Sequence, residues 1–512
     1  MREFQQDTIS SSSRRLFFGW IAAIALVVCT TYLLDILAFQ GVGAGVLLIL
    51  PFLVGFWALF ARGQWWATLP VACSFGGMLY FGFRIHTHEL ALLLAIVSLL
   101  PYVAMTSLKK TTRSPLPIAT YLLCGYFVAH LCVSEYLCVQ EGMGGMGNIM
   151  RVYVHGLWPV VFAILFIRYG SIRHLRYILL IMYFASFARV ALGFLSFLAP
   201  RSMIFIPFIN YILPGTSSAG MDLRASTLLL TSMALCYSSL AKSSLARWMH
   251  LAVLIPAGYL LLLGAGRVSL AVFCGMILFW ALLHRKFVLL GVMAASLALV
   301  IGILNSDPSI MQNADQRVQR TLSILVIKSQ NTDVHKPVED SDRWHYDLMR
   351  HGQDRWLTSP MTFLFGNRIH RYDDSFYSPW VSMGMREELA ARMGAYESGL
   401  WTVLAVTGIV GAVLYVLIFR GLLTDVTLAL FSTGIRNHAD AFSFLAVSGA
   451  LLWVVLCWIS GHFPSQELMM AVIAKAAYDD ARAAANAVTE PVPPATQTPP
   501  ISADGAVLSA RS

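Results

Sequence analysis

Long apolar runs recur along almost the whole chain and restrict it to folds that a membrane allows. About thirteen runs approach the roughly 20 residues that an α-helix needs to cross ~30 Å of hydrocarbon. Only 12% of the residues are charged, against about 25% in ordinary soluble domains. We therefore predict an all-α polytopic membrane protein with about 12–14 transmembrane helices and one long, partly helical periplasmic loop. The runs lie near residues 16–37, 41–61, 64–83, 90–108, 117–138, 152–168, 177–199, 225–241, 248–263, 268–283, 287–304, 398–419 and 440–460.

Basic residues cluster in alternate connections between these runs. The positive-inside rule places such connections in the cytoplasm. The remaining connections, which include 200–224, 264–268 and 305–396, are then predicted on the periplasmic face. The net charge of +9 follows from this topology and indicates no nucleic-acid surface. The cytoplasmic connections contain Arg14, Arg15, Arg62, Lys109, Lys110, Arg113, Arg168, Arg173, Arg176, Lys242, Arg247, Arg285, Lys286, Arg420 and Arg436.

The runs divide the chain into four regions. The insert at 305–396 is polar but too rich in Trp and Tyr for a plain linker, so we expect a small, partly helical periplasmic cap. The eight cysteines show no metal-ligand spacing, and we predict neither a metal site nor a cofactor. The four regions are a transmembrane helical region (1–304), the periplasmic loop (305–396), a C-terminal transmembrane region (397–478) and a disordered tail (479–512).

Two arginines stand where loops meet apolar runs. Arg267 lies in LLLGAGRVSLA, a tight turn between two runs, and Arg224 lies in MDLRASTLLL. Because a charge at a membrane helix centre costs about 2.5–3.5 kcal/mol on insertion scales, a retained one usually faces protein, a cavity or headgroups. A guanidinium offers a planar fork of donors that suits phosphate oxygens. Snorkelling to headgroups or a local ion pair is the alternative for each arginine.

Glu397 is the third candidate. It lies in AYESGLWTVLAV, immediately before the apolar run that follows the long loop. A partly desolvated carboxylate at this boundary is a better base for a hydroxyl proton. The alternative is a favourable negative charge at a helix N-terminus.

The order of these elements resembles the O-antigen ligase and O-antigen polymerase superfamily. The chain is similar to that family in its loop ending in arginine (Asp222 to Leu228), its G-x-G-R-x-S-L turn (Gly264 to Leu270) and its G-x-x-G returning helix (Gly408 to Gly411). Within the long loop, Ser341 to Asn367 is similar to the arginine-led helix that a proline and a glycine turn follow. The resemblance covers roughly residues 200–430 and rests on the order of the motifs.

The resemblance implies a glycosyltransferase of the bacterial inner membrane. It would use a glycan on undecaprenyl pyrophosphate and transfer it to an acceptor hydroxyl, with no nucleotide sugar or required metal. The matching positions for donor pyrophosphate are Arg224 and Arg267. Where ligases have a histidine that activates the acceptor, this chain has Tyr396 and Glu397. This difference favours Glu397 as the catalytic base and a polymerase of O-antigen or exopolysaccharide repeat units.

Two other assignments stay open. An O-antigen ligase would transfer the glycan to lipid A core, and a lipid-linked oligosaccharide transporter (flippase) would also be polytopic with buried arginines. Within the loop, Arg343, Trp344 and His345 are possible glycan-binding residues, although a structural cap would contain similar residues. The expected partners are the lipid-linked oligosaccharide, membrane lipids and a chain-length regulator or other polysaccharide assembly protein.

Overall fold

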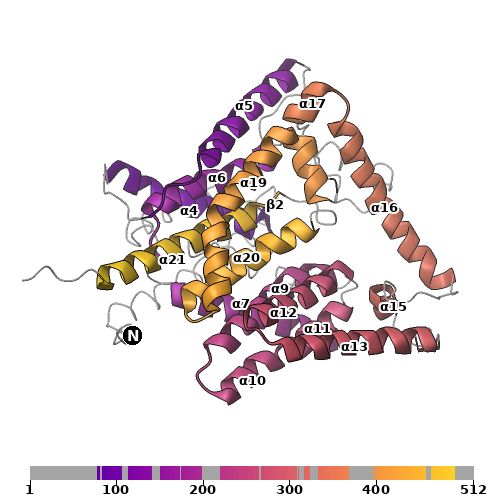
Figure 1. Ribbon diagram of the computed structural model, residues 1–512. Helices are drawn as coiled ribbons and strands as arrows, with labels where there is room; N and C mark the ends of the chain where they lie inside the picture. Colours follow the sequence, from indigo (N-terminus) through magenta and orange to yellow (C-terminus); the bar gives the residue numbers. More distant parts are fainter. Residues whose placement is uncertain are drawn as a thin grey trace, which may run out of the picture.

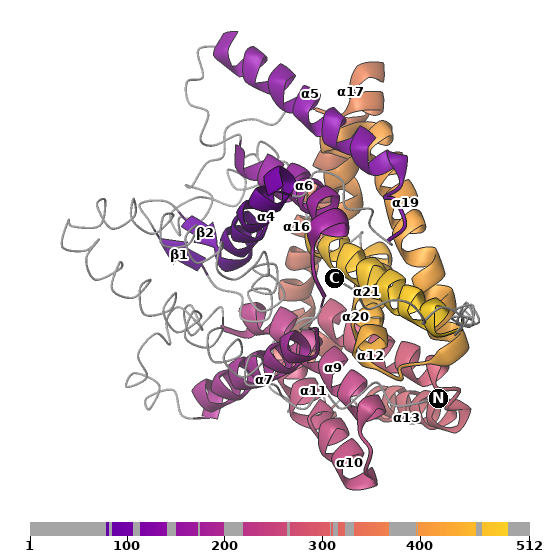
Figure 2. The same ribbon diagram turned by 90° about the vertical axis from the view of Figure 1, so that its left-hand side faces the viewer.

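The computed structural model describes residues 78–80, 84–105, 113–140, 150–172, 175–198, 219–263, 267–307, 309–310, 316–322, 332–367, 396, 398–456 and 463–489. Apart from the segments that connect them, these residues form helices, together with an antiparallel pair of short strands, β1 (Met78–Tyr80) and β2 (Arg84–His86) (Figures 1 and 2). The helices are α4 (Thr87–Met105), α5 (Ile118–Gln140), α6 (Met150–Tyr169), α7 (Leu175–Leu198), α9 (Ala219–Leu240), α10 (Ser244–Ala252), α11 (Leu254–Leu263), α12 (Arg267–Leu283), α13 (Phe287–Ser306), α15 (Gln316–Leu322), α16 (Thr332–Trp356), α17 (Pro360–Phe365), α19 (Gly399–Thr433), α20 (His438–Leu456) and α21 (Ser465–Thr489).

Several described helices have the length and composition of membrane spans. Four segments qualify, namely Ile118–Leu137, Ser244–Leu262, Phe287–Ser306 and Gly399–Thr433. In α13 only Leu304 is buried by the protein, although nearly every side chain is apolar. A helix that is apolar on all sides and is not covered by protein requires lipid around it. The fold is therefore that of an α-helical protein with membrane-type helices, and the full number of spans stays a prediction.

Three helices fall within the segment predicted as the long loop. They are α15, α16 and α17, so the described part of residues 305–396 is helical in part, as expected. α16 is the most polar of the long helices, since its sequence TDVHKPVEDSDRWHYDLMRHGQDRW is dominated by charged and polar side chains. α15 packs against α11 and α12, and α16 packs against α15, α17 and α19. The insert thus links the α11–α12 turn to the start of α19.

Two boundaries differ from those predicted. The run at 64–83 ends in β1, which pairs antiparallel with β2 so that Leu79 lies opposite Ile85. A short apolar segment beside Gly76 and Gly77 suits a strand as well as a helix, and periodicity alone does not separate the two. At the other end, α21 continues to Thr489, so the tail boundary predicted at 479 lies inside a helix. The alanines of its second half have high helix propensity and extend it.

α21 is a central packing element of the C-terminal half. It contacts α20, α6 and α19 (Figures 1 and 2). Its residues from Ala471 to Ala474 are completely buried, as are Ala476 and Ala477. Small side chains allow helix backbones to approach closely, which is how membrane helices gain van der Waals contact.

Candidate functional site

The two candidate arginines occupy equivalent positions on two parallel helices. Ser232 of α9 donates to the Met276 sulfur of α12 at 3.1 Å, and Trp280 Nε1 donates to Ser239 Oγ at 2.8 Å. Ser232 precedes Ser239 on α9, and their partners on α12 follow the same order along the chain. The two helices therefore run in the same direction. These contacts join residues 44 and 41 positions apart in the chain. The separation between Arg224 and Arg267 falls within that interval, so we expect their backbones at similar heights along the helix pair.

That level is the N-terminal end of both helices. Arg267 is the first residue of α12, and Arg224 lies in the second turn of α9. The first turns of a helix have amide N–H groups without intrahelical partners, and the helix dipole adds a partial positive charge there. The N-terminal end of α12, with an arginine there and another in the second turn of α9, forms an arrangement suited to a phosphate group.

The inserted segment is bonded to the end of α11. Thr321 of α15 is fully buried and donates its hydroxyl to the Leu262 carbonyl at 3.0 Å. Leu262 lies in the last turn of α11, where carbonyls have no intrahelical donor. This bond fixes α15 to the end of α11, five residues before Arg267 in the chain.

The three possible glycan-binding residues lie in the middle of α16. Arg343 is exposed and His345 is half-buried, while the side chain of Trp344 lies outside the described residues. They are therefore carried by the helix that connects α15 to α17 and α19.

Glu397 itself lies outside the described residues, but its two neighbours are defined. Ser398 caps α19, because its hydroxyl accepts from the Trp401 amide at 3.5 Å. Tyr396 is only 1% exposed and packs against Gly352 and Trp401. Burial raises the pKa of the Tyr396 phenol, and the Arg355 side chain, which hydrogen-bonds it, lowers that pKa by less. Tyr396 is thus a neutral packing residue at pH 7, which leaves Glu397 as the candidate base of the two.

A contact between two glycines joins the inserted segment to α19. Gly408 has φ 61° and ψ −170°, which breaks α19, and Gly366 after α17 has φ 76° and ψ −179°. The Gly366 amide nitrogen would lie 2.6 Å from a Cβ on Gly408, and that Cβ would also collide with the Leu364 carbonyl. Both positions therefore require glycine, and the two backbones are in direct contact.

Hydrogen bonds close this contact on both sides. The Asn367 amide donates to the Ala405 carbonyl at 2.6 Å, and the Asn367 side chain donates to the Arg355 carbonyl at 2.7 Å. Tyr126 of α5 donates its hydroxyl to the carbonyls of Phe365 and Thr407. We call Tyr126, Gly366, Asn367 and Gly408 the glycine joint. The motif Gly408 to Gly411 and the turn after α17 were each noted in the sequence, but their contact and the role of Tyr126 were not predicted.

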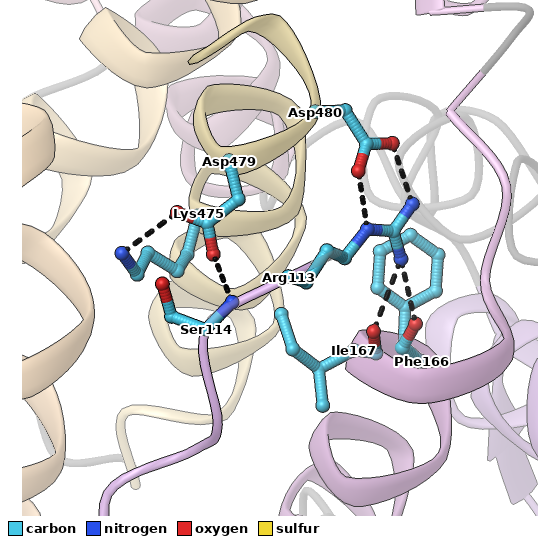
Figure 3. Close-up of polar contacts among 7 residues, drawn as sticks. All are labelled: Arg113, Ser114, Phe166, Ile167, Lys475, Asp479 and Asp480. Carbon is cyan, nitrogen blue, oxygen red and sulfur yellow. Dashed lines mark hydrogen bonds and ion pairs between the residues drawn. The ribbon is translucent and has the colours of Figure 1, made fainter. Parts of the chain in front are cut away.

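A buried charge cluster on α21 was also missed (Figure 3). Arg113 binds Asp480 with two bonds of 2.7 Å and donates to the Phe166 and Ile167 carbonyls at the end of α6. Such bidentate arginine–carboxylate pairs have strong directional bonds. The cluster ties the segment before α5 and the end of α6 to the middle of α21.

Lys475 and Asp479 complete this cluster. Lys475 Nζ lies 2.9 Å from Asp479 Oδ1 and 3.5 Å from Asp425 Oδ2 on α19. The second Asp479 oxygen accepts from the Ser114 amide at 3.0 Å. The i,i+4 spacing of Lys475 and Asp479 within an alanine run was the one signal in the sequence. The cluster holds helices together and presents no unpaired group for catalysis among these residues.

Comparison with known proteins adds no name to this arrangement. No protein-family model matches the chain, and no curated protein is significantly similar to it.

Proposed function

We propose that this protein is a glycosyltransferase of the bacterial inner membrane that polymerises undecaprenyl-pyrophosphate-linked repeat units into O-antigen or exopolysaccharide on the periplasmic side. The observation that supports the proposal is the parallel packing of α9 and α12, whose N-terminal parts carry Arg224 and Arg267 in the sequence. Two guanidinium groups with the free amides of two helix ends match the charge of a pyrophosphate.

The proposed reaction is a displacement at the anomeric carbon of the donor glycan. An acceptor hydroxyl attacks that carbon, the bond to the phosphate oxygen breaks, and the pyrophosphate leaves with the electron pair. Arg224 and Arg267 would stabilise the negative charge that develops on the leaving group. Glu397 would take the proton of the acceptor hydroxyl. A single displacement inverts the anomeric configuration, and no metal or cofactor is required.

The insert connects the end of α11, close in sequence to Arg267, to the residues that flank Glu397. α15 is bonded to the end of α11 near Arg267, and α16 continues from α15 to the start of α19, where Tyr396 and Ser398 flank Glu397. Arg343, Trp344 and His345 on α16 would contact the glycan between these two places. A ligase would use the same chemistry with lipid A core as its acceptor.

A transporter for lipid-linked oligosaccharide is the competing class. Its one structural indication is the break in α19, because transporters often use discontinuous helices to line a substrate site. In this protein the break is filled: the Gly366 backbone contacts Gly408, and Tyr126 and Asn367 bind the neighbouring carbonyls. A broken helix whose freed groups are already bonded has a structural explanation, which favours the enzyme.

The donor site is tested with lysine variants. We expect Arg224→Lys and Arg267→Lys to accumulate at normal levels and to form little polymer, because an ammonium cannot reproduce the bidentate contact. Arg420→Lys, at an exposed arginine of α19, is the matched control and should elongate normally. The assay follows chain length with purified protein and undecaprenyl-linked repeat units. Normal polymer from both lysine variants would reject the donor role.

The base is tested separately with Glu397→Gln. The amide keeps the shape and loses the proton-accepting charge, so transfer should fall about 100- to 10,000-fold while lipid-linked donor still binds. Glu397→His should recover part of the activity. Elongation at the normal rate by the glutamine variant would make Glu397 a helix-end charge.

The sidedness of the proposal is tested by labelling. A single cysteine at Ser375 should react with an impermeant reagent added from the periplasm. A single cysteine at Ser171 should not react. The opposite pattern would place the insert in the cytoplasm and remove the proposed site from the periplasmic face.

A further inference from the structure

An amphipathic helix with an exposed apolar face lies at one edge of the molecule. α10 forms the lower edge in both views (Figures 1 and 2). It ends at Ala252 because Pro256 has no amide to donate to that carbonyl, and a new helix, α11, starts at Leu254. No residue of α10 is buried. Leu245, Trp248 and Met249 are 73%, 67% and 65% exposed.

The two faces of α10 have different surroundings. His250 points to the protein, where its Nδ1 lies 3.1 Å from the Tyr183 hydroxyl. Leu245, Trp248 and Met249 are spaced i, i+3 and i+4, so they share another face. Other exposed apolar residues follow in α11 and at the start of α13, where Ile255 is 76% exposed and Phe287 and Val288 are 67% and 83% exposed. Although α10 is the first part of Ser244–Leu262, a segment long and apolar enough to cross a membrane, the helix breaks at Val253. Short amphipathic helices such as α10 bury their apolar face at the boundary between headgroups and acyl chains.

Positively charged residues lie in and next to α10. From residue 223 to residue 306 the sequence has no Asp or Glu, whereas Lys242, Arg247, Arg285 and Lys286 all lie in or next to α10 and the α12–α13 turn. Lys286 Nζ lies 4.2 Å from the centre of the Trp280 ring.

The cations are close enough to influence one another. Burial lowers the pKa of His284, and the charges of Lys286 and Arg247 lower it further. Burial and then Arg247 lower the pKa of Lys286 in the same direction. The smaller part of each pKa shift, which comes from neighbouring charge, reflects a positive potential from Arg247 and Lys286.

We propose that α10 and the α12–α13 turn form a docking surface for the headgroups of anionic phospholipids. Arg247 and Lys286 bind the phosphate, and Leu245, Trp248 and Met249 insert between the first acyl-chain carbons. Charge complementarity selects an anion, and the adjacent apolar side chains select one that carries acyl chains rather than a free phosphate. The proposal is independent of the glycosyltransferase activity, since none of these residues belongs to the donor or acceptor site.

The test measures lipid preference with the purified full-length protein in neutral detergent. Energy transfer from tryptophan to pyrene-labelled phosphatidylglycerol reports binding, and unlabelled phosphatidylglycerol, phosphatidylcholine and glycerol 1-phosphate compete. Each surface cation contributes about a fivefold preference for anionic lipid, so Arg247→Gln/Lys286→Gln should lower the preference for phosphatidylglycerol about 25-fold. Arg343→Gln/Arg350→Gln, which removes two exposed charges from the insert predicted on the opposite face, should retain it.

A second variant separates the two parts of the surface. Trp248→Ala should weaken both lipids by a similar factor and leave the preference unchanged, because it removes apolar contact and no charge. The proposal would be overturned if the wild type bound phosphatidylglycerol and phosphatidylcholine equally well. It would also be overturned if the control pair lost as much of the preference as Arg247→Gln/Lys286→Gln. Displacement of the labelled lipid by glycerol 1-phosphate at the same concentration as phosphatidylglycerol would also overturn it, in favour of a free phosphate site.

Discussion

Replacing Gly408 by alanine should separate the insert from α19. The residue has φ 61° and ψ −170°, and an added Cβ would collide with the Leu364 carbonyl and the Gly366 amide. Both of these obstacles are backbone groups, so neither can rotate away as a side chain would. Relief of the collision requires α17 and α19 to move apart at the glycine joint.

The cost follows from two separate terms. A non-glycine residue in this region of φ/ψ space is strained by about 1–3 kcal/mol. Separation of the backbones also lengthens the bond from the Asn367 amide to the Ala405 carbonyl and the bonds from the Tyr126 hydroxyl. Each such bond contributes about 1 kcal/mol net. We therefore expect Gly408→Ala to lower the free energy of unfolding by roughly 3–6 kcal/mol.

Two other glycines provide matched controls. Gly434 also has a positive φ, 68°, but its added Cβ would lie 3.7 Å from the nearest atom, so Gly434→Ala carries strain without a collision. Gly449 in α20 has no atom within 4 Å of an added Cβ. Gly449→Ala should be neutral or stabilising by up to about 1 kcal/mol, because alanine has the higher helix propensity. Titration with sodium dodecyl sulfate in mixed micelles, followed by circular dichroism, ranks the three variants.

The order of stability of the three variants tests whether the backbones at Gly366 and Gly408 are in direct contact. The expected order of stability is Gly449→Ala, then Gly434→Ala, then Gly408→Ala. If Gly408→Ala were as stable as Gly434→Ala, the collision would not exist and α17 would not be seated in the break of α19.

Three further predictions concern the remaining contacts. Asp480→Asn should lower the free energy of unfolding by about 1–3 kcal/mol, because Arg113 loses a charged acceptor. Asp354→Asn, in the exposed pair with Arg350, should lower it by under about 0.5 kcal/mol. Equal shifts in Tm for the two variants would contradict this. Tyr126→Phe should lower the free energy of unfolding by about 1–2 kcal/mol, because the carbonyls of Phe365 and Thr407 lose their donor while the ring stays packed. An unchanged Tm would refute the hydrogen bonding. His284 has a folded pKa below its unfolded value, so its contribution to stability is present above pH 6.5 and is lost as the pH falls through the folded pKa. Tm should therefore fall between pH 7.5 and pH 5.5, and it should fall less in His284→Gln; identical profiles would exclude His284 as the source.

Local composition determined much of the helical architecture. The apolar runs at 117–138, 287–304 and 398–419 were predicted as helices and are α5, α13 and the first part of α19. Such runs are informative because a backbone in hydrocarbon must satisfy its own hydrogen bonds, which leaves the helix as the local solution. The turn before Arg267 was also visible, since a glycine-rich segment with one charge interrupts two apolar runs.

Only the tertiary structure decided how these helices use their polar and small residues. The break at Gly408 has no local signature, because a glycine in an apolar run fits a regular helix equally well until α17 takes the space beside it. Lys475 and Asp479 have the composition of an exposed helix face, yet Arg113, Ser114 and Asp425 complete their bonding and bury them. In both cases the partner lies far away in the chain, so sequence near the residue cannot specify the contact. The parallel packing of α9 and α12, the helices that carry Arg224 and Arg267, depends in the same way on contacts between two helices and not on either helix alone.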